Sequence, residues 1–177
     1  MERNNKQWKL FQDLVEKLSA ESSSFAIRYK NESKYMKLLG FILFFNRGFM
    51  GRYTTTSLGK VFFPSRNWLH NIGPTAAYLI LRHEAVHIKD ARRFPIFFQL
   101  SYLLLLPSIF TFRALWEWRA YKETLRVFYE LYGFNSEHEM DRIVYNFTSS
   151  NYLYMFPFRR FLEKRVSKFV KTLDKET

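Results

Sequence analysis

The chain has 177 residues, of which 47% are apolar and 20% aromatic, a composition that excludes a disordered protein and suits one domain with its own core. It contains no Cys, which excludes disulfides and thiolate metal sites, so a zinc ion would have to be bound by His and carboxylate. The formal net charge of +12 is typical of a solvated basic surface, and it also attracts anionic partners.

The first part of the chain predicts two helices and a short strand. Apolar residues recur at helical spacing over residues 3–18, which predicts an amphipathic helix. The alternation of apolar with small or charged residues over 25–29 indicates a short strand or an extended lead-in. Either Asn31 or Ser33 can cap a short helix that runs through Leu39.

A hairpin is predicted after a short apolar run. The run, residues 41–45, suits a buried strand or the end of a helix, since neither its length nor its flanking residues decide between the two. Residues 52–63 contain two groups of strand formers around the turn Ser57-Leu58-Gly59-Lys60, and Pro64 ends the second group. We therefore expect a small antiparallel β element in this region.

Two consecutive helical segments are predicted next. Gly73-Pro74-Thr75 opens a helix that continues through Arg93, and Pro95 ends it. The uncharged stretch over residues 96–106 is interpreted as a buried core helix. A span across a membrane is not expected there, because such a helix needs roughly 20 residues and the flanking prolines leave fewer.

Three more helices are predicted in the last part of the chain, over residues 112–132, 141–147 and 158–173. Gly133 is expected to end the first of them. The last has an apolar stripe with a basic face opposite to it. This basic face consists of Arg159, Arg160, Lys164, Arg165, Lys168 and Lys171.

Two histidines lie four residues apart in the helix predicted over residues 73–93, in the sequence His83-Glu84-Ala85-Val86-His87. Residues at this spacing share one helix face, so both imidazoles can bind one ion. Glu84 is placed to accept a proton from water as it attacks a carbonyl group. The ordinary alternative is a pair of surface histidines beside a glutamate. The mid-helix position and the preceding hairpin favour a metal site, and zinc suits the available ligands.

The motif His83-Glu84-x-x-His87 resembles the signature of the zincin metallopeptidases, and Glu117-Trp118-Arg119-Ala120-Tyr121 resembles the second motif of their gluzincin branch. This resemblance implies that Glu117 is the third zinc ligand, that Glu84 is the catalytic base, and that an upstream edge strand aligns the substrate. Tyr121 departs from the Asp that other gluzincins have there, so the hydrogen bond of that Asp is absent or replaced. The wider pattern is similar to uncharacterised metallopeptidases of bacteriophage and bacterial genomes.

Three other residues compete with Glu117 as the third ligand. Glu123 follows six residues later beside two cations, which suits an exposed face, whereas Glu117 lies between two tryptophans. His70 and His138 lack a supporting motif. We rank Glu117 first and leave the other three open.

Two tyrosines, Tyr152 and Tyr154, could donate to a developing oxyanion, although packing is the ordinary role of a tyrosine.

Together these features predict an α+β fold in a single zincin-like domain over residues 1–177, mostly helical, with a small antiparallel β element before the metal-binding helix. The expected function is zinc-dependent hydrolysis of a peptide or amide bond in a peptide or protein substrate. One alternative is a basic nucleic-acid or virion-associated binding protein on a degenerate peptidase fold, which would bind a polyanion through the helix over 158–173. The other is a membrane-associated protease that uses residues 94–112, although a membrane partner is not expected.

The polar start of the chain lacks the apolar core of a signal peptide. We therefore expect a cytoplasmic protein. If a phage encodes it, we expect it in the cytoplasm of the host cell or in a virion.

Overall fold

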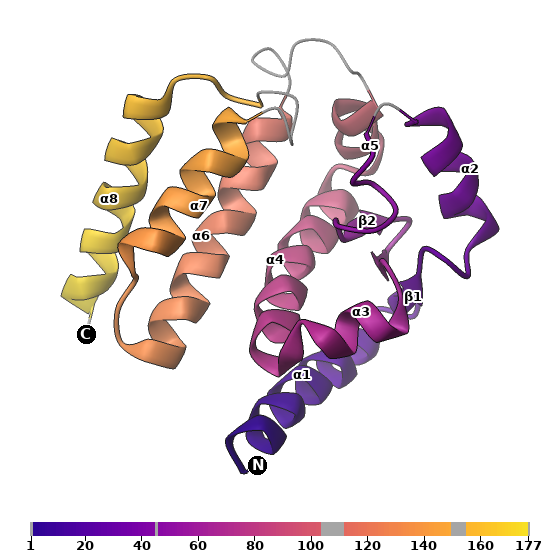
Figure 1. Cartoon of the computed structure of the whole chain (residues 1–177), viewed down its shortest axis with the longest axis horizontal. Helices are drawn as coiled ribbons and strands as arrows, with labels where there is room; N and C mark the ends of the chain where they lie inside the picture. Colours follow the sequence, from indigo (N-terminus) through magenta and orange to yellow (C-terminus); the bar gives the residue numbers. More distant parts are fainter. Residues whose placement is uncertain (1, 45, 104–111, 150–154, 177) are drawn as a thin grey trace. The chain divides into compact units, whose positions relative to one another are not determined.

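The computed structural model describes residues 2–44, 46–103, 112–149 and 155–176. It is mostly helical with one small mixed sheet, which confirms the predicted α+β class (Figure 1). The chain divides into two compact units, Met1–Arg92 and Arg93–Thr177, which we call the first and the second unit. The single domain expected from the sequence stays a prediction.

The first unit contains the predicted N-terminal helix, strand, capped helix, hairpin and His-bearing helix. Ser33 caps the second helix as expected, because its side chain accepts a hydrogen bond from the backbone N–H of Met36 at 3.2 Å. The apolar run that begins at Phe41 ends this helix rather than forming a strand. In chain order the elements are α1 (Glu2–Glu21), β1 (Ala26–Tyr29), α2 (Lys34–Ile42), β2 (Thr55–Ser57), β3 (Lys60–Phe63), α3 (Arg66–Asn71) and α4 (Gly73–Arg93), whose last residue begins the second unit.

The sheet consists of the predicted hairpin and one further strand. β2 and β3 pair antiparallel, with Thr56 opposite Val61. Between these strands, Leu58 and Gly59 both have positive φ, 51° and 75°, as a two-residue hairpin turn requires. β1 pairs parallel with β3, so the strand order is β1-β3-β2 and β2 lies at an edge of this sheet.

The core of the first unit is built mainly from α1, β3 and α4, with Leu69 of α3 and Phe25 just before β1. Residues 77, 81, 85 and 88 of α4 are buried, and their spacing of three or four residues places them on one helix face. Burial on α4 extends beyond this apolar stripe, because Glu84, His87 and Asp90 are buried as well. α4 therefore holds titratable side chains on a packed and ordered support.

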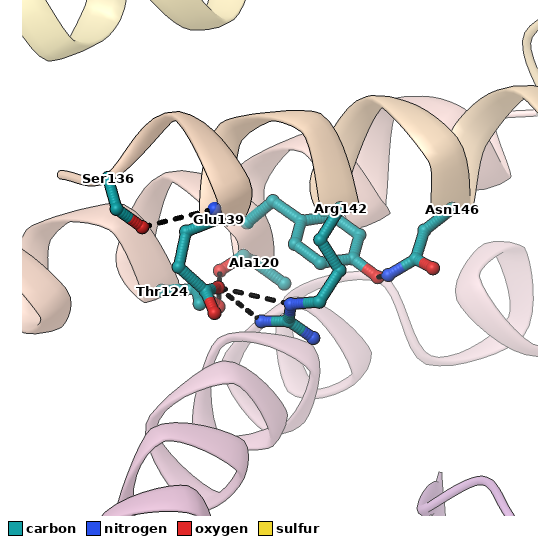
Figure 2. A network of polar contacts seen from close by, with 7 residues as sticks. Ala120, Thr124, Ser136, Glu139, Arg142 and Asn146 are labelled. Carbon is teal, nitrogen blue, oxygen red and sulfur yellow. Dashed lines mark hydrogen bonds and ion pairs between the residues drawn. The ribbon is translucent and has the colours of Figure 1, made fainter.

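The second unit contains four helices in the part that the structure describes: α5 (Pro95–Leu103), α6 (Arg113–Tyr132), α7 (Glu137–Thr148) and α8 (Arg159–Glu176). Gly133 ends α6 in the left-handed conformation, at φ 77°, as predicted. α7 begins earlier than expected, because the side chain of Ser136 accepts a hydrogen bond from the backbone N–H of Glu139 (Figure 2). In the same network Asn146 of α7 donates to the hydroxyl of Tyr121 of α6 at 2.8 Å.

The C-terminal helix α8 packs its apolar side on α6 and α7, where Leu162, Val166 and Leu173 are buried. The predicted stripe is shorter than expected, since Phe158 and Phe161 are exposed. All six cations of the predicted basic face are exposed, which confirms the face itself. Its binding to a polyanion stays a prediction.

The prediction of a buried core helix over residues 96–106 is wrong for the residues of α5 that the structure describes. Ile96, Phe97 and Leu100 are exposed, whereas Phe98 is buried against α6, with its ring centroid 5.8 Å from that of Trp116. A nine-residue helix that packs on one neighbour buries one side only, whatever its composition. Among the described helices, none is both long and apolar enough to cross a membrane.

Candidate metal centre

The two histidines of the motif lie side by side on one face of α4. Their Nε2 atoms lie 3.2 Å apart and their ring centroids 4.9 Å apart. His87 is buried and His83 is half-buried. Both lie well inside the 21-residue helix, away from its ends, so the backbone fixes their relative position.

The geometry of this pair fits a metal ion. Two imidazole nitrogens bonded at about 2.05 Å to one tetrahedral zinc ion are about 3.3 Å apart. The observed separation of 3.2 Å is close to this value. It also suits a hydrogen bond between the two rings, and a metal assay distinguishes these two cases.

The motif glutamate, Glu84, is held by the hairpin. Its side chain is buried, and its Oε2 accepts a hydrogen bond of 2.6 Å from the hydroxyl of Thr56 on β2. This bond joins residues 28 positions apart in the sequence and places the edge strand next to the motif. The expected proximity of the hairpin to the His-bearing helix is thereby confirmed.

A buried lysine, Lys30, interacts with the same carboxylate. Lys30 is 0% exposed, and its Nζ donates to the backbone carbonyl of Phe49 at 2.6 Å and lies 4.1 Å from the centroid of the Phe49 ring. Burial lowers the pKa of the Lys30 ammonium from its ordinary 10.5 to about 7, while the charge of Glu84 acts in the opposite direction. Sequence reasoning identified neither Lys30 nor Thr56.

The buried lysine predicts a pH-dependent stability. Because the pKa of Lys30 is about 7 in the folded protein and 10.5 ordinarily, the unfolded chain binds a proton in this interval that the folded chain does not. The free energy of unfolding of the metal-free protein should therefore rise with pH, by up to about 1.4 kcal/mol per pH unit. Lys30→Met should remove this rise in urea denaturation, whereas Lys37→Met, at an exposed position, should keep it. Equal pH slopes for Lys30→Met and the parent protein would contradict the assignment.

In the second unit, Glu117 lies on α6 as a buried carboxylate, 7% exposed. Its sequence neighbours Trp116 and Trp118 are also buried, which confirms the expected aromatic shielding. Ala120, one turn later, is completely buried. Glu123 is half-buried, and its carboxylate lies 3.6 Å from the guanidinium of Arg126, as its basic surroundings suggested.

Among the His, Asp and Glu side chains of the described residues, His83, His87 and Glu117 form a group that could hold a metal ion. The two other histidines are not in this group. His70 is exposed on α3 with its ring 5.8 Å from that of Trp8, and His138 is exposed in the first turn of α7.

The two tyrosines considered as oxyanion donors, Tyr152 and Tyr154, lie outside the described residues.

No family model matches the chain, and neither a curated protein nor a solved structure is detectably similar to it.

Proposed function

We propose that this protein is a zinc-dependent hydrolase that cleaves peptide or amide bonds. The observation that carries the proposal is the pair of imidazole nitrogens 3.2 Å apart, with a buried carboxylate held by a hydrogen bond beside them on the same helix. His83 and His87 would hold the metal, with Glu117 as the third ligand. Glu84 would act as general base and then as general acid.

The chemistry of this ligand set favours zinc. Two neutral imidazoles and one carboxylate are the ligands of many catalytic zinc sites, which keep a fourth position for water. When bound, zinc lowers the pKa of a water molecule and polarises the carbonyl group of the substrate. With zinc counted as +2, two neutral histidines and one carboxylate would leave the loaded site with a net charge of +1, which would favour the loss of a proton from a bound water.

In this proposal Glu84 moves the proton. Its Oε2 is occupied by the hydroxyl of Thr56, which leaves Oε1 to accept a proton from the attacking water. The same carboxyl group then donates this proton to the leaving amine, so that one water is consumed and one acid and one amine are formed. Thr56 acts through Glu84 and is therefore a positioning residue.

The edge strand supports a peptide as the substrate. β2 pairs with β3 along one side only within the described sheet. Backbone groups along the other side of such a strand can pair with an extended peptide. Since Thr56 lies on this strand and bonds to Glu84, a peptide aligned there would pass close to the proposed base.

Metal content is the direct test of this proposal. The purified protein should contain about one zinc ion per chain and should cleave members of a mixed peptide library, with new termini identified by mass spectrometry. A chelator should abolish both the metal and the cleavage, and added zinc should restore both. A chain that neither contains zinc nor takes it up would contradict the proposal.

Replacement of Thr56 tests the positioning role. Thr56→Val removes the hydroxyl donor and should lower kcat by about tenfold to 100-fold, because a hydrogen bond to a charged group contributes about 1.5–3 kcal/mol. Zinc content should stay the same, and Thr56→Ser, which keeps the donor, should recover most of the activity. Equal activity of the Val and Ser variants would remove Thr56 from the mechanism.

A second candidate function is that of a basic binding protein on a degenerate peptidase fold, which binds a polyanion and has lost hydrolytic activity. The six exposed cations on α8 favour binding to a polyanion. This candidate predicts polyanion binding without any cleavage, with or without zinc.

A further inference from the structure

The short helix α2 has apolar residues on two opposite sides. On one side, Met36 is completely buried and packs with Phe49 and Phe62. On the other side, Leu38, Phe41 and Ile42 are 60%, 79% and 56% exposed. Their spacing of three and four residues places these three side chains on one helix face, which we call the apolar face of α2.

Basic residues adjoin the apolar face. Lys34 and Lys37 are exposed and lie one helical turn before Leu38 and Phe41, respectively. The first turn of α2 contains no acidic residue. Long lysine side chains of this kind can extend along apolar surface while the ammonium stays in water.

The nearby acidic residue does not cancel this charge. Glu32, just before the helix, accepts a hydrogen bond of 3.0 Å from Arg66 of α3. After the helix, the exposed side chains of Arg47 and Arg52 add to the positive charge. Exposed cations therefore lie both before and after the residues of the apolar face in the sequence.

We propose that the apolar face of α2 docks on the surface of an anionic lipid bilayer. Leu38, Phe41 and Ile42 would enter the boundary between headgroups and acyl chains, and the lysines would contact anionic headgroups. The helix lies in the plane of the bilayer and does not span it.

The charges favour a bilayer over two competing occupants of this face. In a symmetric dimer the same patch meets itself, which would bring the lysines of both copies together without an acidic partner. A nucleic acid would satisfy the lysines but would leave Leu38, Phe41 and Ile42 in water. An anionic bilayer satisfies both the apolar and the basic residues.

This inference is independent of the proposed hydrolysis, because α2 shares no residue with the motif on α4. A protein that docks without cleaving, or cleaves without docking, would separate the two.

Vesicle binding of the full chain tests the inference. The protein should sediment with vesicles of phosphatidylcholine and phosphatidylglycerol and only weakly with pure phosphatidylcholine, and added salt should weaken the binding. Because any basic protein can bind anionic vesicles, the decisive variant is Phe41→Ser, which should bind at least about tenfold more weakly. Lys34→Gln and Lys37→Gln should each weaken binding by about fivefold.

The matched control is Phe134→Ser, which removes an equally large exposed aromatic ring beyond the end of α6 and should leave binding unchanged. Both phenylalanines are exposed, so circular dichroism should show an unchanged fold. Binding of Phe41→Ser at the parent level, or a loss of binding with Phe134→Ser as well, would overturn the inference. A concentration-dependent dimer that Phe41→Ser abolishes, in the absence of vesicles, would assign the face to a second copy instead.

Discussion

Glu84→Gln is expected to keep zinc bound and to lower peptide turnover by about 10²–10⁴-fold, the contribution typical of general acid–base catalysis. Glu84 is not a proposed ligand, so metal affinity should not depend on its charge. The amide oxygen of Gln can still accept the hydrogen bond from Thr56, so the side chain should keep its position. What the variant loses is the ability to accept a proton.

The measurement compares zinc content with turnover of one cleaved library peptide. Glu16→Gln, at an exposed position of α1, is the matched control and should change neither quantity. Full turnover of Glu84→Gln would exclude Glu84 as the base. A zinc-loaded parent protein without any turnover, together with salt-sensitive binding to a polyanion, would favour the basic binding protein instead.

The parts of the site that follow local geometry could be predicted from the sequence. Two histidines four residues apart lie on one face of any helix, and Gly73-Pro74-Thr75 at the start and Pro95 after the end were sufficient to predict that helix. The structure places their nitrogens 3.2 Å apart. The hairpin was predictable for the same reason, because strand formers and a glycine at the turn are local signals.

Residues that act over a long sequence distance could not be predicted. Thr56 was recognised as a strand former, and nothing in its neighbourhood indicates a bond to a carboxylate 28 residues later. Lys30 is one of 28 basic residues, which are usually exposed. Its burial depends on the carbonyl group and ring of Phe49, in a segment without a predicted helix or strand.

The error on α5 has a related cause. An uncharged apolar stretch suits a helix that is buried on all sides and equally a helix that is buried on one side. The sequence does not show how many other elements pack against the helix. The same reasoning applies to α2. Two residues of its exposed apolar face, Phe41 and Ile42, belong to the apolar run over residues 41–45, which suited either a strand or the end of a helix. Composition alone therefore overestimates burial where a short helix has few neighbours.

The hydrogen bond between Thr56 and Glu84 gives the hairpin a role beyond the fold. β3, the central strand, provides Val61 and Phe63 to the core, so the position of the hairpin is fixed by packing. β2, at the edge, then brings Thr56 to the motif. If Glu84 is the base and β2 aligns a peptide, as we propose, this hydrogen bond would couple the position of the peptide to proton transfer, and a displacement of about 1 Å would impair catalysis.

The third ligand is tested by Glu117→Ala, which should weaken zinc binding by more than about 100-fold. Loss of a residue that merely orients a ligand already lowers metal affinity by about 10–100-fold, and loss of a direct ligand should exceed this. Competition with a chromophoric chelator measures the affinity without any reference to turnover. Glu123→Ala, six residues later on α6 with its carboxylate beside Arg126, is the matched control and should bind zinc like the parent.

Because Glu117 is buried, its replacement could also change the stability of the metal-free protein. The gain in stability on adding zinc separates the two effects, since it depends only on the zinc concentration and the Kd of each variant. The parent and Glu123→Ala should both gain several kcal/mol at zinc concentrations of about 1,000 Kd, and Glu117→Ala should gain far less at the same concentration. If Glu117→Ala gains as much as the parent while Glu123→Ala, His70→Ala or His138→Ala does not, the gluzincin-like ligand set is wrong, and His83 and His87 bind the metal with a different partner.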